Sequence, residues 1–141
     1  MIKTISQDRR TFEAPRERTV PNEEERMADA FSNMTPQIKL SFVSDAAEDA
    51  VFGRGVAALC RGVREHGSLN KAAKNMSMAY SKAWRIMKTT EEAFGVQLLE
   101  RDGAHGSTLT PEGQRLLDTY DEVQRRTSAY AADALKELMA K

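Results

Sequence analysis

Five basic side chains without an acidic neighbour mark a candidate binding site in the middle of the chain. The whole chain has 141 residues with 21 basic and 21 acidic side chains, so its formal net charge is zero. The stretch from residue 66 to residue 90 has no aspartate or glutamate, but it contains Lys71, Lys74, Lys82, Arg85 and Lys88. Phosphate groups respond to this local field rather than to total charge. The stretch indicates a polyanion-binding surface, and the alternative is a solvated helix face beneath acidic neighbours.

Catalytic and metal-binding chemistry have little support in the sequence. The chain has two histidines and one cysteine, and Cys60 and His66 point to different faces of one predicted helix. No zinc-ligand spacing is present. Acidic residues of the last predicted helix, Asp118, Asp121 and Glu122, are expected on its solvated side. We therefore expect no enzyme, no metal site and no cofactor.

Length and composition favour a small globular protein of the cytoplasm. A chain of this length forms one ordinary domain, or a small domain with a tail. No apolar run approaches the roughly 18 residues that a membrane helix needs, and the N-terminus has no segment of signal-peptide type. The single cysteine excludes an intramolecular disulfide, and its place on an apolar helix stripe favours burial.

Three short helices are predicted in succession. The first covers residues 54–66, with Val56, Leu59, Cys60 and Val63 on one face, and it ends at Gly67. A second helix follows from an N-cap at Ser68 to about residue 75, and a third covers residues 79–94 up to Gly95. Two helices joined by a turn of three or four residues are typical of a helix-turn-helix.

The helices are flanked by segments with the alternation of β-strands. Residues 36–43 are predicted as a strand and residues 50–52 as its return, joined to the first helix through Gly53 and Gly55. After the third helix, residues 96–101 and 107–110 are predicted to form a hairpin around a turn at residues 102–106. A hairpin in this position is a wing, so the fold is predicted to be mainly α with a small β component, a winged helix-turn-helix.

The two ends of the chain differ from this domain. Residues 1–35 are predicted as a poorly ordered arm, although Asn22 is placed to cap a short helix over residues 22–31. Residues 36–110 form the predicted winged domain. Thr110 and Pro111 begin a last helix, which fills residues 111–141.

The last helix carries an apolar stripe with heptad-like spacing, which predicts dimerisation. The winged domain is too small to cover the stripe, so a second copy of the chain is the expected partner. The alternative is that the helix folds back on its own domain. The stripe consists of Leu116, Tyr120, Val123, Thr127, Tyr130, Ala134 and Leu138.

The third helix is the predicted recognition helix, because the second helix of the motif enters the major groove of DNA. Ser81, Arg85 and Lys88 recur at helical spacing on a polar face, and Arg85 is suited to bidentate contact with guanine. The start of the second helix favours phosphate, and Arg101 and His105 belong to the wing. The predicted DNA-binding residues are Ser68, Asn70, Lys71, Tyr80, Ser81, Lys82, Arg85, Lys88, Arg101 and His105.

These segments resemble a known family of DNA-binding domains. Gly67, Ser68, Leu69, Ala72, Ala73, Tyr80, Ala83 and Trp84, followed by Leu109, Thr110, Gly113, Leu116 and Leu117, match the pattern of ModE-like molybdate-responsive regulators and, more distantly, of the LysR family. The resemblance covers residues 36–120. It implies a winged helix that dimerises through its last helix and binds a two-fold DNA site.

Two departures limit what the resemblance implies. Ala79 stands where the family often has serine, so the recognition helix loses an expected cap. Only about 20 residues, all helix-like, follow Tyr120, so binding of molybdate is not carried over to this chain. A rival interpretation is an adaptor, a winged helix that binds proteins rather than DNA and uses the stripe of the last helix as its working surface.

Overall fold

The computed structural model describes residues 20–45, 47–101 and 106–141. The chain divides into two compact units, and each is considered by itself. The larger unit spans Gln37–Ala134, and the smaller one comprises the described residues up to Pro36 together with Leu135–Lys141. All the predicted DNA-binding residues fall within the larger unit.

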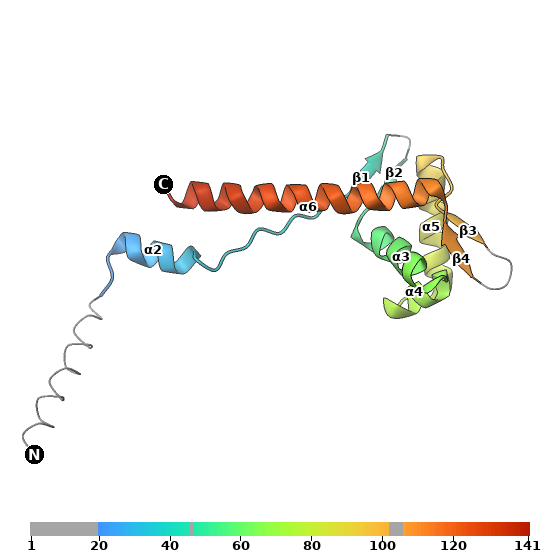
Figure 1. Cartoon of the computed structure of the whole chain (residues 1–141), viewed down its shortest axis with the longest axis horizontal. Helices are drawn as coiled ribbons and strands as arrows, with labels where there is room; N and C mark the ends of the chain where they lie inside the picture. Colours follow the sequence, from blue (N-terminus) through green and yellow to red (C-terminus); the bar gives the residue numbers. More distant parts are fainter. Residues whose placement is uncertain (1–19, 46, 102–105) are drawn as a thin grey trace, which may run out of the picture. The chain divides into compact units, whose positions relative to one another are not determined.

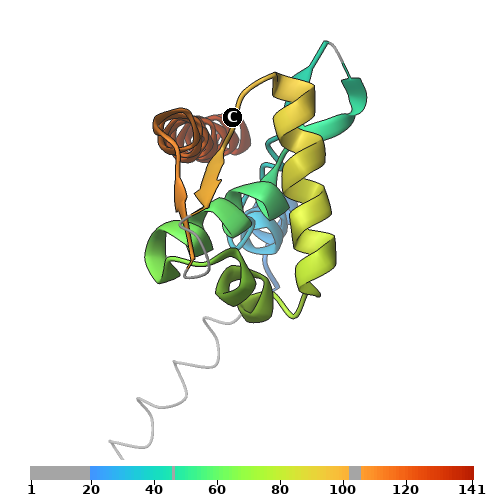
Figure 2. The ribbon, with the colours of Figure 1, turned by 90° about the vertical axis from the view of Figure 1, so that its right-hand side faces the viewer.

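The larger unit is a winged helix-turn-helix. Its elements follow the order β1 (Phe42–Ser44), β2 (Ala47–Phe52), α3 (Arg54–His66), α4 (Leu69–Asn75), α5 (Tyr80–Phe94), β3 (Leu99–Arg101), β4 (Ser107–Leu109) and α6 (Pro111–Met139), with only the end of α6 in the smaller unit (Figure 1). Figure 2, in which α6 is seen end-on, shows α3, α4 and α5 beside the β3–β4 hairpin. Both hairpins are antiparallel.

The helix boundaries follow local signals, as predicted. Gly67 ends α3 in the left-handed conformation, with φ of 73°, which glycine adopts without steric cost. The hydroxyl of Ser68 caps α4 by accepting a hydrogen bond from the backbone N–H of Lys71 at 3.1 Å. Ala79 precedes α5 and provides no side-chain cap, so the expected loss of a cap is confirmed. The first helical residue of α5 is Tyr80, one residue later than predicted.

A continuous apolar core joins the three helices to the wing and to the first half of α6. Phe52, Leu59, Cys60, Met87 and Leu117 are almost completely buried. Burial raises the pKa of the Cys60 thiol to about 12, so the thiolate is absent at neutral pH. The prediction that Cys60 is a core residue is therefore confirmed.

In the first predicted hairpin, the first strand is shorter than predicted and the return strand is longer. Residues 36–44 alternate between half-buried and exposed, as predicted, but only Phe42–Ser44 pairs with another strand. The carbonyl oxygens of Ile38 and Leu40 instead accept hydrogen bonds from the side chains of Gln124 and Tyr120, at 3.3 and 2.9 Å. The segment before β1 is thus extended along α6. Conversely, the return strand β2 begins at residue 47, three residues earlier than predicted.

The wing also begins later than predicted. Strand β3 starts at Leu99 rather than at residue 96, because the carboxylate of Glu91 at the end of α5 accepts hydrogen bonds from the backbone N–H groups of Leu98 and Leu99. These bonds hold the backbone that would otherwise extend the strand. Residues 102–105 of the predicted turn lie outside the described residues.

The base of the wing is fastened to the corner between α3 and α4. The backbone N–H of Ser107 donates to the carbonyl oxygen of Gly67 at 2.9 Å. Gly106 has φ of 150°, and a Cβ at this position would lie 2.3 Å from the same oxygen. Only glycine permits so close an approach of the two backbones. The wing therefore has a fixed position relative to the helix-turn-helix.

Helix α6 starts from a capped and tightly packed end. The Thr110 hydroxyl accepts from the N–H of Gly113 at 2.9 Å and donates to the carbonyl oxygen of Gln97 at 2.6 Å. Gly113 packs so closely that a Cβ there would lie 2.4 Å from the carbonyl oxygen of Leu98. These contacts confirm the predicted start of the helix and fix its origin against the wing.

The smaller unit contains α2 (Glu23–Phe31) and the last residues of the chain. Asn22 caps α2, as predicted, by accepting a hydrogen bond from the backbone N–H of Glu25 at 2.7 Å. No residue of α2 is buried, and Met27 is half-exposed. That residues 1–35 form a poorly ordered arm stays a prediction.

Candidate nucleic-acid interface

Helix α5 separates an apolar face from a polar one. Ala83 and Met87 are buried in the core, whereas Ser81, Lys82 and Arg85 are exposed. This division results from the helical period, because residues three and four positions apart lie on the same face. The exposed face carries two cations at the N-terminal half of the helix, the part that reaches base edges in helix-turn-helix complexes.

The cations of this face differ in what they contact. Lys88 lies 3.7 Å from the carboxylate of Glu91, and its ammonium group is 5.5 Å from the centre of the half-exposed Trp84 ring. In contrast, no ion pair joins Lys82 or Arg85 to a carboxylate in the described part of the chain. Lys82 and Arg85 are therefore available to an external anion without first breaking an internal pair.

A polar hollow lies beside the start of α5. It is lined by residues 66–71, by Tyr80 and Arg101, and by residues 106 and 107. Asn70 and Lys71 are exposed at its edge, and Ser68 is half-buried because its hydroxyl caps α4. None of the lining residues is acidic. The hollow thus brings together five predicted DNA-binding residues, from the start of α4, the start of α5 and the end of β3, in a setting that favours binding of an anion.

Arg101 is the predicted DNA-binding residue of the wing that lies within the described residues. The guanidinium of Arg101 donates a hydrogen bond to the Tyr80 hydroxyl at 3.1 Å, which joins the end of β3 to the first residue of α5. The sequence could not indicate this pair, because the two residues are 21 positions apart in different elements. His105, the other predicted wing residue, lies outside the described residues.

The predicted stripe of α6 divides into a covered and an open part. Tyr120 is only 4% exposed, packs edge-on against the rings of Phe42 and Phe52 with centroids 5.5 Å apart, and bonds the Leu40 carbonyl. Tyr120 is therefore a core residue, and its prediction as a dimer contact is corrected. Leu116, Val123, Thr127 and Ala134 are half-buried, while Tyr130 and Leu138 are exposed.

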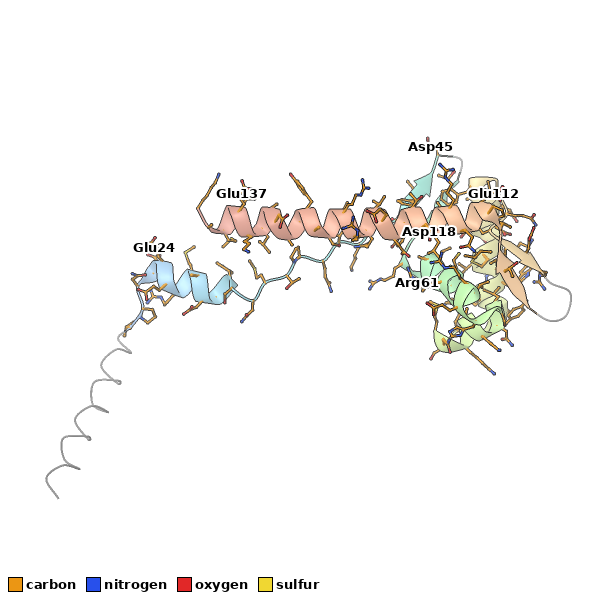
Figure 3. The ribbon with its side chains drawn as sticks, in the orientation of Figure 1. Glu24, Asp45, Arg61, Glu112, Asp118 and Glu137 are labelled. Atoms are coloured by element: carbon orange, nitrogen blue, oxygen red, sulfur yellow. The ribbon has the colours of Figure 1, made fainter. Side chains whose placement is uncertain are left out.

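Two arginines of α3 fix the first half of α6 to the helix-turn-helix. Arg61 pairs with Asp121 at 2.5 Å, and Arg64 pairs with Asp118 at 2.8 Å and also bonds Gln114. Figure 3 labels Arg61 and Asp118 at this junction. The sequence interpretation placed Asp118 and Asp121 on the solvated side of the helix and did not predict the two pairs, because they join residues far apart in the sequence.

Neither a metal-binding cluster nor a membrane-spanning helix is present among the described residues. No group of three or more histidine, cysteine, aspartate or glutamate residues is clustered there as it would be around a metal ion. Among the helices of the described ranges, none is long and apolar enough to cross a membrane.

Comparison with known proteins identifies the helix-turn-helix segment. Residues 58–114 match the family model described as bacterial regulatory helix-turn-helix protein, lysR family. Transcriptional regulator ModE of Haemophilus influenzae is 32% identical over 83 residues, which cover 56% of this chain and 32% of ModE. HTH-type transcriptional regulator TdcA of Escherichia coli K12 is 37% identical over 59 residues, which cover 42% of this chain and 19% of TdcA. The resemblance to ModE-like and LysR-type domains is thereby confirmed.

The chain is also similar to a solved structure. The crystal structure of the BenM_DBD/benA site 1 DNA complex contains a chain 26% identical to this one, with a TM-score of 0.48; the match covers 62% of this chain and 94% of that one. The matched part of this chain spans about a third of ModE and a fifth of TdcA.

Proposed function

We propose that this chain, whose residues 58–114 match the LysR-family helix-turn-helix, is a cytoplasmic, sequence-specific DNA-binding transcriptional regulator that acts as a homodimer. The observation that carries the proposal is the exposed face of α5, where Lys82 and Arg85 have no carboxylate partner among the described residues. The relatives ModE and TdcA are named transcriptional regulators, which supports a regulatory rather than a catalytic role.

Recognition of bases is assigned to α5. With this helix in the major groove, Ser81 and Arg85 lie on the face turned to the base edges, and the planar guanidinium of Arg85 is suited to the O6 and N7 atoms of guanine. Lys82 and Lys88 supply positive charge to the flanking phosphates. A bidentate contact of this kind contributes about 1–3 kcal/mol of discrimination against the wrong base.

Contacts to the DNA backbone are assigned to the hollow and the wing. Ser68, Asn70 and Lys71 approach the phosphate chain on one side of α5, and Tyr80 and Arg101 do so from the wing side. The wing, residues 101–108 with His105, runs along the backbone. Such contacts fix the register of the protein on the duplex without reading its sequence.

Dimerisation is assigned to α6 beyond its buried first turns. Val123 and Thr127 are half-buried and Tyr130 and Leu138 are exposed, which leaves apolar surface for a second copy of the helix. Leu116 is half-buried against the core of its own domain and lies at the edge of this interface. A two-fold dimer presents two copies of α5 to half-sites roughly one helical turn apart.

Fluorescence anisotropy with the purified chain tests this function. The labelled duplexes are a random sequence and the DNA upstream of its own gene, each titrated at several salt concentrations. We expect binding that weakens steeply with salt and is tighter for the upstream duplex, and the slope counts the phosphate contacts. Equal binding to both duplexes would contradict sequence specificity. Absence of binding at low salt would contradict the DNA-binding function and favour the protein-binding adaptor.

A further inference from the structure

The bond between Arg101 and Tyr80 connects two elements that are already fixed relative to each other. Arg101 pairs with Ser107 across the hairpin, and the backbone N–H of Ser107 is bonded to the Gly67 carbonyl. Tyr80 is the first residue of α5, just after the tight turn that joins it to α4. The backbones of Arg101 and Tyr80 therefore have defined positions, and only their side chains are free to move.

The chemistry of the pair leaves the guanidinium of Arg101 able to bind an anion. A guanidinium has five N–H donors in a planar fork, and the contact with the Tyr80 oxygen at 3.1 Å uses one of them. Arg101 lines the hollow described above, whose lining residues include Lys71 but no carboxylate. A free arginine side chain samples many rotamers, which binding would otherwise have to restrict.

We propose that Tyr80 is a positioning residue that acts on DNA through Arg101: its hydroxyl holds the guanidinium over the hollow, where it binds a backbone phosphate beside the recognition helix. This inference rests on the proposed DNA-binding function and goes beyond it, because it makes the wing contact depend on a residue of α5. In this inference Tyr80 acts on DNA only through Arg101, which replaces the direct phosphate contact assigned to Tyr80 under the proposed function.

A double-mutant cycle tests the proposal with the full chain and the duplexes named above. The variants are Tyr80→Phe, Arg101→Gln and the double substitution, each titrated by anisotropy over a salt series. We expect Tyr80→Phe to weaken binding about fivefold, as loss of one hydrogen bond does, and to lower the salt slope toward that of Arg101→Gln. In the Arg101→Gln background, Tyr80→Phe should have no further effect.

Two controls make the outcome interpretable. Arg115→Gln removes one exposed positive charge from α6 and should leave the salt slope unchanged. Thermal unfolding of Tyr80→Phe should match that of the unmodified chain, since the ring is retained and only a half-exposed hydroxyl is lost.

Three results would overturn the inference. If Tyr80→Phe weakened DNA binding equally in the unmodified chain and in the Arg101→Gln variant, Tyr80 would contact DNA by itself. No loss on Tyr80→Phe, while Arg101→Gln weakens binding, would show that the arginine needs no positioning, and the proposed function would stand. If the unmodified chain bound neither duplex, the proposed function would fail, and this inference would fail with it.

Discussion

Arg85 of α5 and Arg125 and Arg126 of α6 are all exposed, but they differ in whether a carboxylate is bonded to them. On α6, Arg125 and Arg126 both bond the carboxylate of Glu122, at 2.5 and 2.8 Å. These contacts hold the pKa of Glu122 at about 2 even though the carboxylate is exposed. On α5, Lys82 and Arg85 have no such partner among the described residues.

The difference shows which positive charges can be used for binding. An arginine already bonded to a neighbouring carboxylate must give up that contact before it can bind a phosphate, and the local field is partly neutralised. An unpaired arginine on a helix face has neither cost. The whole chain has equal numbers of basic and acidic residues, but the N-terminal half of α5 carries positive charges without a carboxylate partner among the described residues.

The largest expected effect comes from reversing the charge on α5. Arg85→Glu should weaken binding to the upstream duplex by about a hundredfold or more, because it removes a base contact and adds repulsion to phosphate. The measurement is an anisotropy titration at fixed salt. The matched control is Arg126→Glu on α6, which should change affinity by less than about threefold, since that charge is already paired. Equal losses in both variants would abolish the distinction between the two helices.

A charged side chain at Val123 tests the proposed dimer interface on α6. Val123→Glu should raise the dimer dissociation constant at least about tenfold, because burial of an unpaired carboxylate in an apolar interface is unfavourable. Sedimentation velocity over a range of protein concentrations measures the change. Val43→Glu, at an exposed position of β1, should leave the dimer intact. A dimer that survives Val123→Glu unchanged would place the interface elsewhere.

The junction between the wing and α6 is expected to tolerate no side chain. Gly113→Ala should lower the free energy of unfolding by about 2 kcal/mol, because the new Cβ would lie 2.4 Å from the Leu98 carbonyl oxygen. Gly55→Ala is the control, since a Cβ there meets no atom within 4 Å. Urea unfolding measures the free energy of unfolding of both variants. A Gly113→Ala variant as stable as Gly55→Ala would mean that α6 shifts freely against the wing.

The smallest effect concerns the paired charges of α6. The pKa of Glu122 lies at about 2, below its ordinary value of 4.5, so the ion pairs stabilise the fold at pH above 4.5 and lose their effect as the pH falls toward 2. Glu122→Gln should therefore lower the melting temperature slightly at pH 7, and the difference should vanish near pH 2. A difference that persists at pH 2 would show that charge pairing is not its cause. Thermal scans followed by circular dichroism provide the measurement.

Much of the winged fold could be predicted because its signals are local. Gly67 ends α3, Ser68 caps the start of α4, and Thr110 and Pro111 begin α6. Each of these residues acts within one helical turn. The buried and exposed faces of α5 follow from residue spacing alone. The exposed cations of the candidate interface were predicted for the same reason.

The sequence prediction was wrong where one pattern of residues was compatible with two different packing partners. Alternating side chains at residues 36–43 predicted a strand, and the alternation is present, but the backbone before β1 bonds side chains of α6 instead of a strand. Spacing placed Tyr120 on the stripe, yet the aromatic rings of Phe42 and Phe52 bury it. A sequence pattern defines a face but does not identify what covers that face.

The sequence by itself thus determined the order of the elements, the caps of α3, α4 and α6, and the separation of charge on α5, because each depends on residues close together in the chain. Only the tertiary structure decided which half of the α6 stripe is covered, and which carboxylates pair with Arg61 and Arg64. It also brought Arg101 to Tyr80. These contacts join residues far apart in sequence, and their geometry exists only once the core has assembled.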